Sequence, residues 1–324
     1  MTAVEERAVA GAAPAPPAPV AAPVVAPARV APPIGAVRGL FTWVFATVAV
    51  LALWSVFYGL ALSGFHEKHA QAELYAKMRA DLALQTAPVG PAVVLGETDE
   101  NAPPTPIAPG TPVALITAPT LGLRDVVVAE GTASGDLKSG PGHKRDTVLP
   151  GELGTSVVFG RSTLFGAPFK HLGSAKAGDT ITVTDGLGKL TYVVDRVRRA
   201  GDPAPADDGG AHLLLATATG GSLSNGYQPS GALYLDATLK GTALVAPVGR
   251  PGAIPANEEL LQGSSSNLFA LVLWLQLLVL AGGAVTWMAS RWGAWQTYLV
   301  GVPVLVAALW GVTQTAVELL PNVM

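Results

Sequence analysis

Residues 130–172 read EGTASGDLKSGPGHKRDTVLPGELGTSVVFGRSTLFGAPFKHL. Two turn sequences, Gly140-Pro141-Gly142-His143 and Leu149-Pro150-Gly151, precede the β-type segment TSVVFG at 155–160. Similar segments flank this stretch: VALIT (113–117), DVVVA (125–129), TITVT (180–184), LTYVVDRVR (190–198), HLLLATA (212–218) and ALYLDATL (232–239). Clusters of Gly, Pro and Asp separate them. Many short strands with turns between them predict a mainly β domain over 111–248, either a compact barrel or a sandwich.

Outside this domain, apolar residues gather in three blocks, at 38–65, 267–289 and 295–320. About 20 apolar residues in a helix cross the roughly 30 Å hydrocarbon core of a membrane. Only 13% of all residues are charged, which fits a membrane protein. One N-terminal and two C-terminal transmembrane helices are therefore predicted. A cleaved signal peptide is an alternative for the first block, with Ala61-Leu62-Ser63 as the small-residue cleavage site.

Four further segments connect these parts. Residues 1–37 are rich in Ala and Pro, which predicts a disordered cytoplasmic tail. Charged helix formers at 66–86 predict a juxtamembrane helix. The prolines of residues 87–110 predict a semi-rigid linker, and a second linker is expected at 249–266.

Arginines in short loops predict the orientation in the membrane. Arg38 precedes the first block and Arg291 lies in the turn between the last two. Arginine and lysine in short loops favour the cytoplasmic side. The sequence therefore predicts a plasma-membrane protein with three spans, a cytoplasmic N-terminus and an extracytoplasmic β-domain. The small residues Gly282, Gly283, Gly301 and Gly311 predict that the last two helices pack closely.

The turn sequences of 130–172 also carry a family resemblance. Together with Gly166, Pro168, Phe169 and Leu172, the ordered turns resemble the sortase family, in particular the class E, housekeeping-like sortases of actinobacteria. The resemblance covers about residues 111–248. It implies the closed β-barrel of that family.

Sortases cut a sorting signal with a cysteine thiolate, protonate the leaving amine with a histidine and steady the oxyanion with an arginine. The resemblance places Arg161 at the histidine position, Ala218 at the cysteine position and Ala232 at the arginine position. The chain contains no cysteine at all. Because alanine has no nucleophilic atom and arginine stays protonated at physiological pH, no catalytic residue of the sortase type is expected.

Other side chains could in principle replace the lost chemistry. The hydroxyls nearest in sequence to Ala218 are those of Thr217, Thr219, Ser222 and Ser224. A hydroxyl needs a positioned base, and His212 lies six residues before Ala218, roughly 20 Å along a regular strand. His143 and His171 are interpreted as turn and surface residues.

The groove of the family could survive without its chemistry. Arg161, Thr217 and Thr219 are then possible groove-binding residues, with Arg161 attracting a carboxylate or a polar peptide. The alternative is that Arg161 points to solvent. Asp202, Asp207 and Asp208 are interpreted as an acidic surface loop, with a calcium site as the alternative, and no metal or cofactor is predicted.

These observations predict a membrane-anchored, catalytically inactive sortase-like protein that acts as an extracytoplasmic binding or scaffold module. Its partner would be an exported protein, a cell-wall component or a membrane subunit. The net charge of −3 gives no indication of nucleic-acid binding. Two alternatives stay open: a transpeptidase or hydrolase with non-standard chemistry or completed by a partner, and a subunit of a membrane complex that works through the C-terminal helical hairpin.

Overall fold

The computed structural model describes residues 45, 49–54, 56–91, 104–206, 208–220 and 229–324. The chain divides into two compact units, residues 1–50 and 51–324, and the β-domain with its surroundings lies in the second. The predicted tail at 1–37 lies outside the described residues. So do parts of the predicted first span at 38–65 and of the linker at 87–110.

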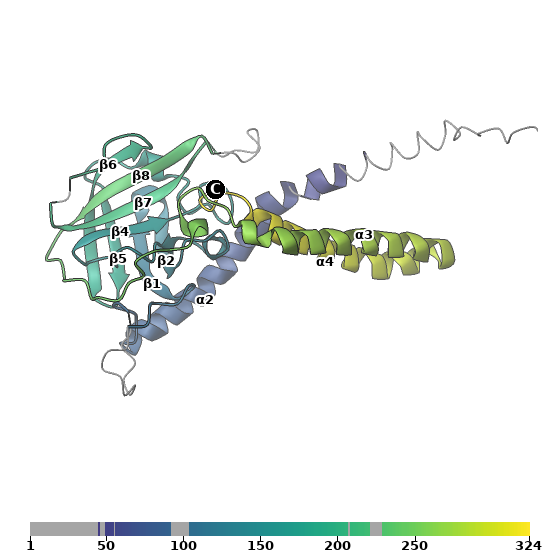
Figure 1. Cartoon of the computed structure of the whole chain (residues 1–324), viewed down its shortest axis with the longest axis horizontal. Coiled ribbons are helices and arrows are strands. Elements are labelled where there is room, and N and C mark those ends of the chain that lie inside the picture. The colour runs from purple at the N-terminus through teal and green to yellow at the C-terminus, as the bar shows by residue number, and fades with distance from the viewer. Residues whose placement is uncertain (1–44, 46–48, 55, 92–103, 207, 221–228) are drawn as a thin grey trace, which may run out of the picture. The chain divides into compact units, whose positions relative to one another are not determined.

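Within the described residues, eight strands close into a barrel in the order β1-β2-β3-β4-β7-β8-β6-β5 (Figure 1). The strands are β1 (Pro112–Ala118), β2 (Leu123–Glu130), β3 (Gly142–His143), β4 (Gly154–Phe159), β5 (Thr180–Asp185), β6 (Gly188–Arg199), β7 (Ala211–Thr219) and β8 (Gly231–Leu239). Short 3₁₀ turns connect them at Pro119–Leu121, Asp136–Lys138 and Leu172–Ser174, and two more follow at Ala256–Glu258 and Ser265–Asn267. The predicted mainly β fold is confirmed, and it is the barrel rather than the sandwich.

Alternation along β7 divides its side chains between two environments. Leu213 and Leu215 are fully buried in the barrel interior, whereas Ala216 and Ala218 belong to a second apolar cluster. Successive side chains of a strand point to opposite faces, so this second cluster lies on the outer face of the barrel. That face is where the candidate site is found.

A long helix, α2 (Ser63–Ala83), packs against β1 and β2. A single π-helical turn, Tyr58–Leu62, leads directly into it. The side chain of Gln71 donates to the carbonyl oxygens of Val127 (3.0 Å) and Ser139 (2.7 Å) and accepts from the Val127 amide (2.9 Å). Since β2 pairs with β3 only at Ala129 and Glu130, Gln71 satisfies main-chain groups that this short pairing leaves open.

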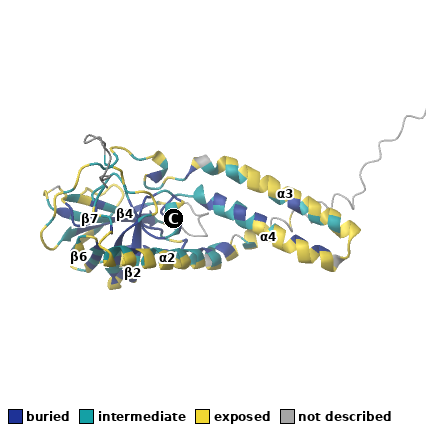
Figure 2. Cartoon of the chain, turned by 90° about the horizontal axis from the view of Figure 1, so that it is seen from below, coloured by how far each residue is buried: buried dark blue, intermediate teal, exposed yellow. Residues whose placement is uncertain are grey.

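Two apolar helices, α3 (Leu268–Arg291) and α4 (Ala294–Glu318), form a hairpin. Both are long and apolar enough to cross a membrane, as predicted. Most side chains of α3 are exposed, as expected for a surface that faces lipid (Figure 2). A Cβ atom added at Gly301 would lie 2.8 Å from the Val285 side chain, and one added at Gly311 would overlap the Trp274 ring.

The predicted role of the glycines is therefore confirmed for Gly301 and Gly311 and wrong for the other two. A Cβ atom added at Gly282 or Gly283 would meet nothing within 4 Å. Gly282 is half-buried and Gly283 is exposed, so neither lies where the two helices approach each other most closely.

Gly311→Ala should loosen the hairpin, because the new methyl group cannot fit against Trp274 without moving one helix. Overpacking of this kind costs about 1–3 kcal/mol. SDS titration of the purified full chain measures the loss. Gly283→Ala, the same change at an open position, is expected to leave the unfolding midpoint unchanged. Equal midpoints for the two variants would contradict the close contact at Gly311.

Candidate functional site

The three positions singled out by the sequence lie at the ends of neighbouring strands. Arg161 follows Gly160 directly after β4, Ala218 lies near the end of β7, and Ala232 lies near the start of β8. Phe159 is in register with Ala216, and Ala218 is in register with Ala232. The order β4-β7-β8 in the barrel therefore brings all three positions to one end of adjacent strands (Figure 1).

Arg161 is the largest fully buried side chain near this end, with 0% of its surface exposed. Its guanidinium group donates from Nη2 to the Ser134 carbonyl (2.8 Å) and hydroxyl (3.0 Å), from Nε to the Leu137 carbonyl (3.2 Å), and from Nη1 to the Met324 main-chain oxygen (3.0 Å). Arg161 therefore points neither into an open groove nor to solvent. Its donors are used to join three separate segments of the chain.

The positive charge of Arg161 is stabilised mostly by the dipoles of main-chain carbonyl groups. The guanidinium carbon lies 5.0 Å from the centre of the Phe165 ring, and the ion pairs among the described residues include none between Arg161 and a carboxylate side chain. Burial lowers the pKa of Arg161 to about 10, which still leaves the group protonated at neutral pH. A permanently charged group of this kind cannot exchange a proton with a substrate as imidazole does.

Ala218 is covered. It is only 4% exposed and belongs to an apolar cluster with Leu137, Phe159, Ala216, Val323 and Met324. Val323 and Met324 come from the segment that follows α4, and both are fully buried. The outer face of β4 and β7, where Ala218 lies, is thus filled by the chain itself.

The two threonines predicted to line the groove lie in different surroundings. Thr217 is 2% exposed, and its hydroxyl donates to the Gly160 carbonyl oxygen (2.7 Å). Thr219 is half-buried, with its hydroxyl 3.4 Å from that of Ser230. A surface cavity of about 710 Å³ opens beside it, lined among others by Arg199, Asp202, Thr219, Ser230, Ala232 and Leu233. Of the sequence-predicted positions, Thr219 therefore reaches an open space, Ala232 lies in its wall but is only 2% exposed, and Arg161 and Thr217 do not line it.

The histidines of the barrel have partners of their own. His212, at the opposite end of β7 from Ala218, lies 2.7 Å from Asp208 Oδ1. His143 is only 1% exposed, and its ring nitrogens lie 2.8 Å from Glu130 Oε2 and from the Val148 carbonyl oxygen. The interpretation of His143 as a surface turn residue is wrong, because it forms a buried pair with Glu130. His171 is exposed, as predicted.

The acidic residues of the β6–β7 loop make local contacts where they are described. Asp202 accepts a hydrogen bond from the Arg199 amide (2.7 Å), and Asp208 accepts from the Gly210 amide (2.8 Å). Asp207 lies outside the described residues. Both carboxylates therefore stabilise local turns by accepting hydrogen bonds from main-chain amides two or three residues away.

Comparison with known proteins identifies the domain. Residues 116–218 match the model of the sortase domain. A sortase E from Streptomyces avermitilis is 31% identical over 41% of this chain and 91% of its own, with a TM-score of 0.35. A Clostridium perfringens sortase D5 transpeptidase is 19% identical over 53% of this chain and 99% of its own, with a TM-score of 0.40. None of the curated proteins matches the chain.

Proposed function

The chain carries a sortase-family domain, and we propose that this domain is a catalytically inactive, membrane-anchored binding module related to the class E sortases. The proposal rests on which side chains stand at the ends of β4 and β7 and at the start of β8. Alanine stands at positions 218 and 232, and a buried arginine stands at 161. None of these side chains can attack a carbonyl carbon or shuttle a proton.

The surroundings of these positions also favour an inactive site. The Thr217 hydroxyl is buried and committed to the Gly160 carbonyl oxygen, so it lacks both a base and access to substrate. Among the described residues of the barrel, no histidine lies next to Ala218 in the strand register. Groups that act as a unit in catalysis lose most of their effect when one member is missing, and here all three are replaced.

We propose that the domain lies outside the cytoplasm. Helices α3 and α4 can anchor it, and Arg291 in their connecting turn favours the cytoplasmic side. The barrel then lies on the outer face of the plasma membrane, with the region 38–65 as a further span. An exported protein, a cell-wall component or another membrane subunit is the partner that such a position makes available.

A cavity beside Ala232 is open for binding in the described part of the domain. Arg199, Asp202 and the hydroxyls of Thr219 and Ser230 give it both charges and neutral hydrogen-bonding groups. Its volume of about 710 Å³ lies within the range of about 300–1,000 Å³ that is usual for ligand pockets. A polar segment of an exported partner fits this chemistry.

Ser230→Trp should block partner binding, because Ser230 is an exposed residue of the cavity lining and the indole ring would fill the cavity. The measurement is quantitative co-purification of proteins from the native membrane. The wild-type chain should retain a partner that the Ser230→Trp variant loses at least tenfold. Ala177→Trp, which introduces the same ring at an exposed position in the loop before β5, serves as the control. Equal recovery by both variants would count against binding at this cavity.

Restoring the family's chemistry tests the inactive state. The changes are Ala218→Cys, Arg161→His and Ala232→Arg, made singly, in pairs and together. No single or double variant should cleave a sorting-signal peptide, because each still lacks the nucleophile, the proton donor or the oxyanion-stabilising cation. Cleavage is followed by mass spectrometry, and product from any single or double variant would contradict the proposal.

A further inference from the structure

The segment Pro321–Met324, here called the covering segment, follows α4 and folds back onto the barrel. It forms a tight turn in which the Met324 amide donates to the Pro321 carbonyl oxygen (3.2 Å). Asn322, Val323 and Met324 are all 0% exposed. Complete burial of three successive residues outside a helix or strand requires that their polar groups find partners in the domain.

Asn322 supplies the polar anchor of the covering segment. Its side-chain nitrogen donates to the carbonyl oxygens of Thr132 (2.8 Å) and Glu259 (2.9 Å), and its amide donates to the Gln262 carbonyl oxygen (2.9 Å). One side chain therefore bridges the loop after β2 and the loop before α3. The three hydrogen bonds fix both the position and the orientation of the turn.

Val323 and Met324 fill the face over Ala218. Their side chains pack in the cluster that contains Ala218, and the Ser162 amide donates to the Val323 carbonyl oxygen (3.1 Å). Arg161 donates to the main-chain oxygen of Met324. Arg161 thus holds the segment that covers Ala218.

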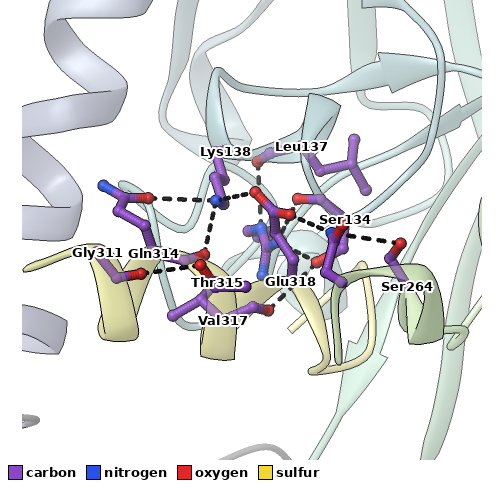
Figure 3. Close-up of polar contacts among 11 residues, drawn as sticks. Ser134, Leu137, Lys138, Ser264, Gly311, Gln314, Thr315, Val317 and Glu318 are labelled. Atoms are coloured by element: carbon purple, nitrogen blue, oxygen red, sulfur yellow. Dashed lines mark hydrogen bonds and ion pairs between the residues drawn. The ribbon is translucent and has the colours of Figure 1, made fainter. Parts of the chain in front are cut away.

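The end of α4 is fixed to the same part of the barrel (Figure 3). Lys138 donates to the Gln314 carbonyl oxygen (2.9 Å) and to the Glu318 carboxylate (2.5 Å), and the Ser134 hydroxyl lies 3.4 Å from the Val317 carbonyl oxygen. The carbonyl groups at the C-terminal end of a helix carry partial negative charge, which attracts hydrogen-bond donors and cations. Lys138 and Ser134 approach this end from the barrel side.

We infer that the covering segment is the resident occupant of the barrel face over Ala218, and that this face opens to another molecule only when the segment is displaced. Two residues, Leu319 and Leu320, separate the end of α4 from Pro321. Leu319 and Leu320 therefore tether the covering segment to the end of α4, which Lys138 and Ser134 hold against the barrel.

The inference rests on the proposed function only in treating the face as a binding face. Its test uses the absence of native cysteine and needs no partner. Ala218→Cys places a single thiol beneath the covering segment, and the rate of its reaction with a maleimide is measured on the full chain in detergent. Val323→Asp, in the same chain, should release the segment and raise this rate at least tenfold, because a carboxylate cannot stay in the apolar cluster.

Two controls separate release of the segment from other effects. Val248→Asp is the same substitution at a residue that is 83% exposed, and it should leave the rate at position 218 unchanged. Ala237→Cys places the thiol in the barrel core, where it should stay unreactive with and without Val323→Asp. If position 237 became reactive, the comparison would be made with the milder Asn322→Ala.

The labelling rates of Ala218→Cys either support or overturn the inference. Slow reaction of Ala218→Cys that becomes fast with Val323→Asp or Asn322→Ala supports the inference. Fast reaction in the otherwise unchanged chain, or slow reaction in all variants with the core intact, overturns it. Neither result bears on cleavage or on partner recovery, so the proposed function stands or falls by its own tests.

Discussion

Arg161→Met should destabilise the extramembrane part of the chain by at least about 3 kcal/mol, because three buried main-chain oxygens lose their donor together. Methionine fills part of the volume but donates no hydrogen bond. The carbonyl groups of Ser134 and Leu137 and the main-chain oxygen of Met324 then lose a donor inside the protein. Each buried acceptor left without a partner costs about 1–3 kcal/mol.

The measurement is urea unfolding of the full chain in detergent, followed by circular dichroism. Arg161→Lys should recover only part of the loss, because one ammonium group cannot reach three carbonyl oxygens that a guanidinium fork spans. Arg124→Met, at an exposed position of β2, should change the stability by less than about 0.5 kcal/mol. A loss below about 1 kcal/mol for Arg161→Met would show that the guanidinium group has no structural role.

This expectation bears on the restoration experiment. Arg161→His removes the same donors, so the restored triple variant must be shown to fold before a lack of cleavage is interpreted. The same substitution also loosens the covering segment, since Arg161 donates to the main-chain oxygen of Met324.

Thiol labelling of intact cells should give an all-or-none result for the orientation in the membrane. Lys189→Cys lies at an exposed position of the barrel, and Ser290→Cys lies at the end of α3 near the connecting turn. A membrane-impermeant maleimide should label Lys189→Cys in intact cells and Ser290→Cys only after the membrane is opened. The reason is that Arg291 in a short loop is retained on the cytoplasmic side.

A third position decides the number of spans. Ala10→Cys should behave like Ser290→Cys if 38–65 crosses the membrane, because three spans put the N-terminus and the α3–α4 turn on the same side. With only α3 and α4 in the membrane, Ala10→Cys would instead be labelled together with the barrel. Labelling of Ser290→Cys in intact cells would contradict the predicted orientation itself.

The architecture could be predicted because its signals are local. The turns around Pro141 and Pro150, the short β-type segments and the two apolar helices each depend on residues close together in the sequence. The family pattern in those turns added the closure of the barrel. The same local signals could not choose between the glycines of α3, because which side of a helix meets its neighbour is decided by packing.

The contents of the site could be predicted only in part. The sequence placed Arg161, Ala218 and Ala232 through their order within a family pattern, and the register of β7 and β8 puts the last two side by side. It could not predict the burial of Arg161, because arginine is almost never buried without partners and these partners come from two distant segments, 134–137 and 321–324.

The covering segment was missed for the same reason. Residues 321–324 have no periodic pattern and follow directly on a membrane helix, so nothing in the sequence indicates that they return to the barrel. The pair of His143 and Glu130 also joins residues 13 positions apart, across the parallel pairing of β2 and β3. Contacts of this kind become visible only when the fold brings the segments together.

The most direct test of the proposed catalytic inactivity is a cleavage assay with the wild-type chain. The purified protein is incubated with a sorting-signal peptide and an amine acceptor, and the masses of peptide and protein are followed. With alanine at position 218 and a buried arginine at 161, the proposal predicts that the peptide stays intact and that the protein gains no mass. A cleaved or amine-joined peptide, or a covalent adduct on Thr217 or Thr219, would contradict the account.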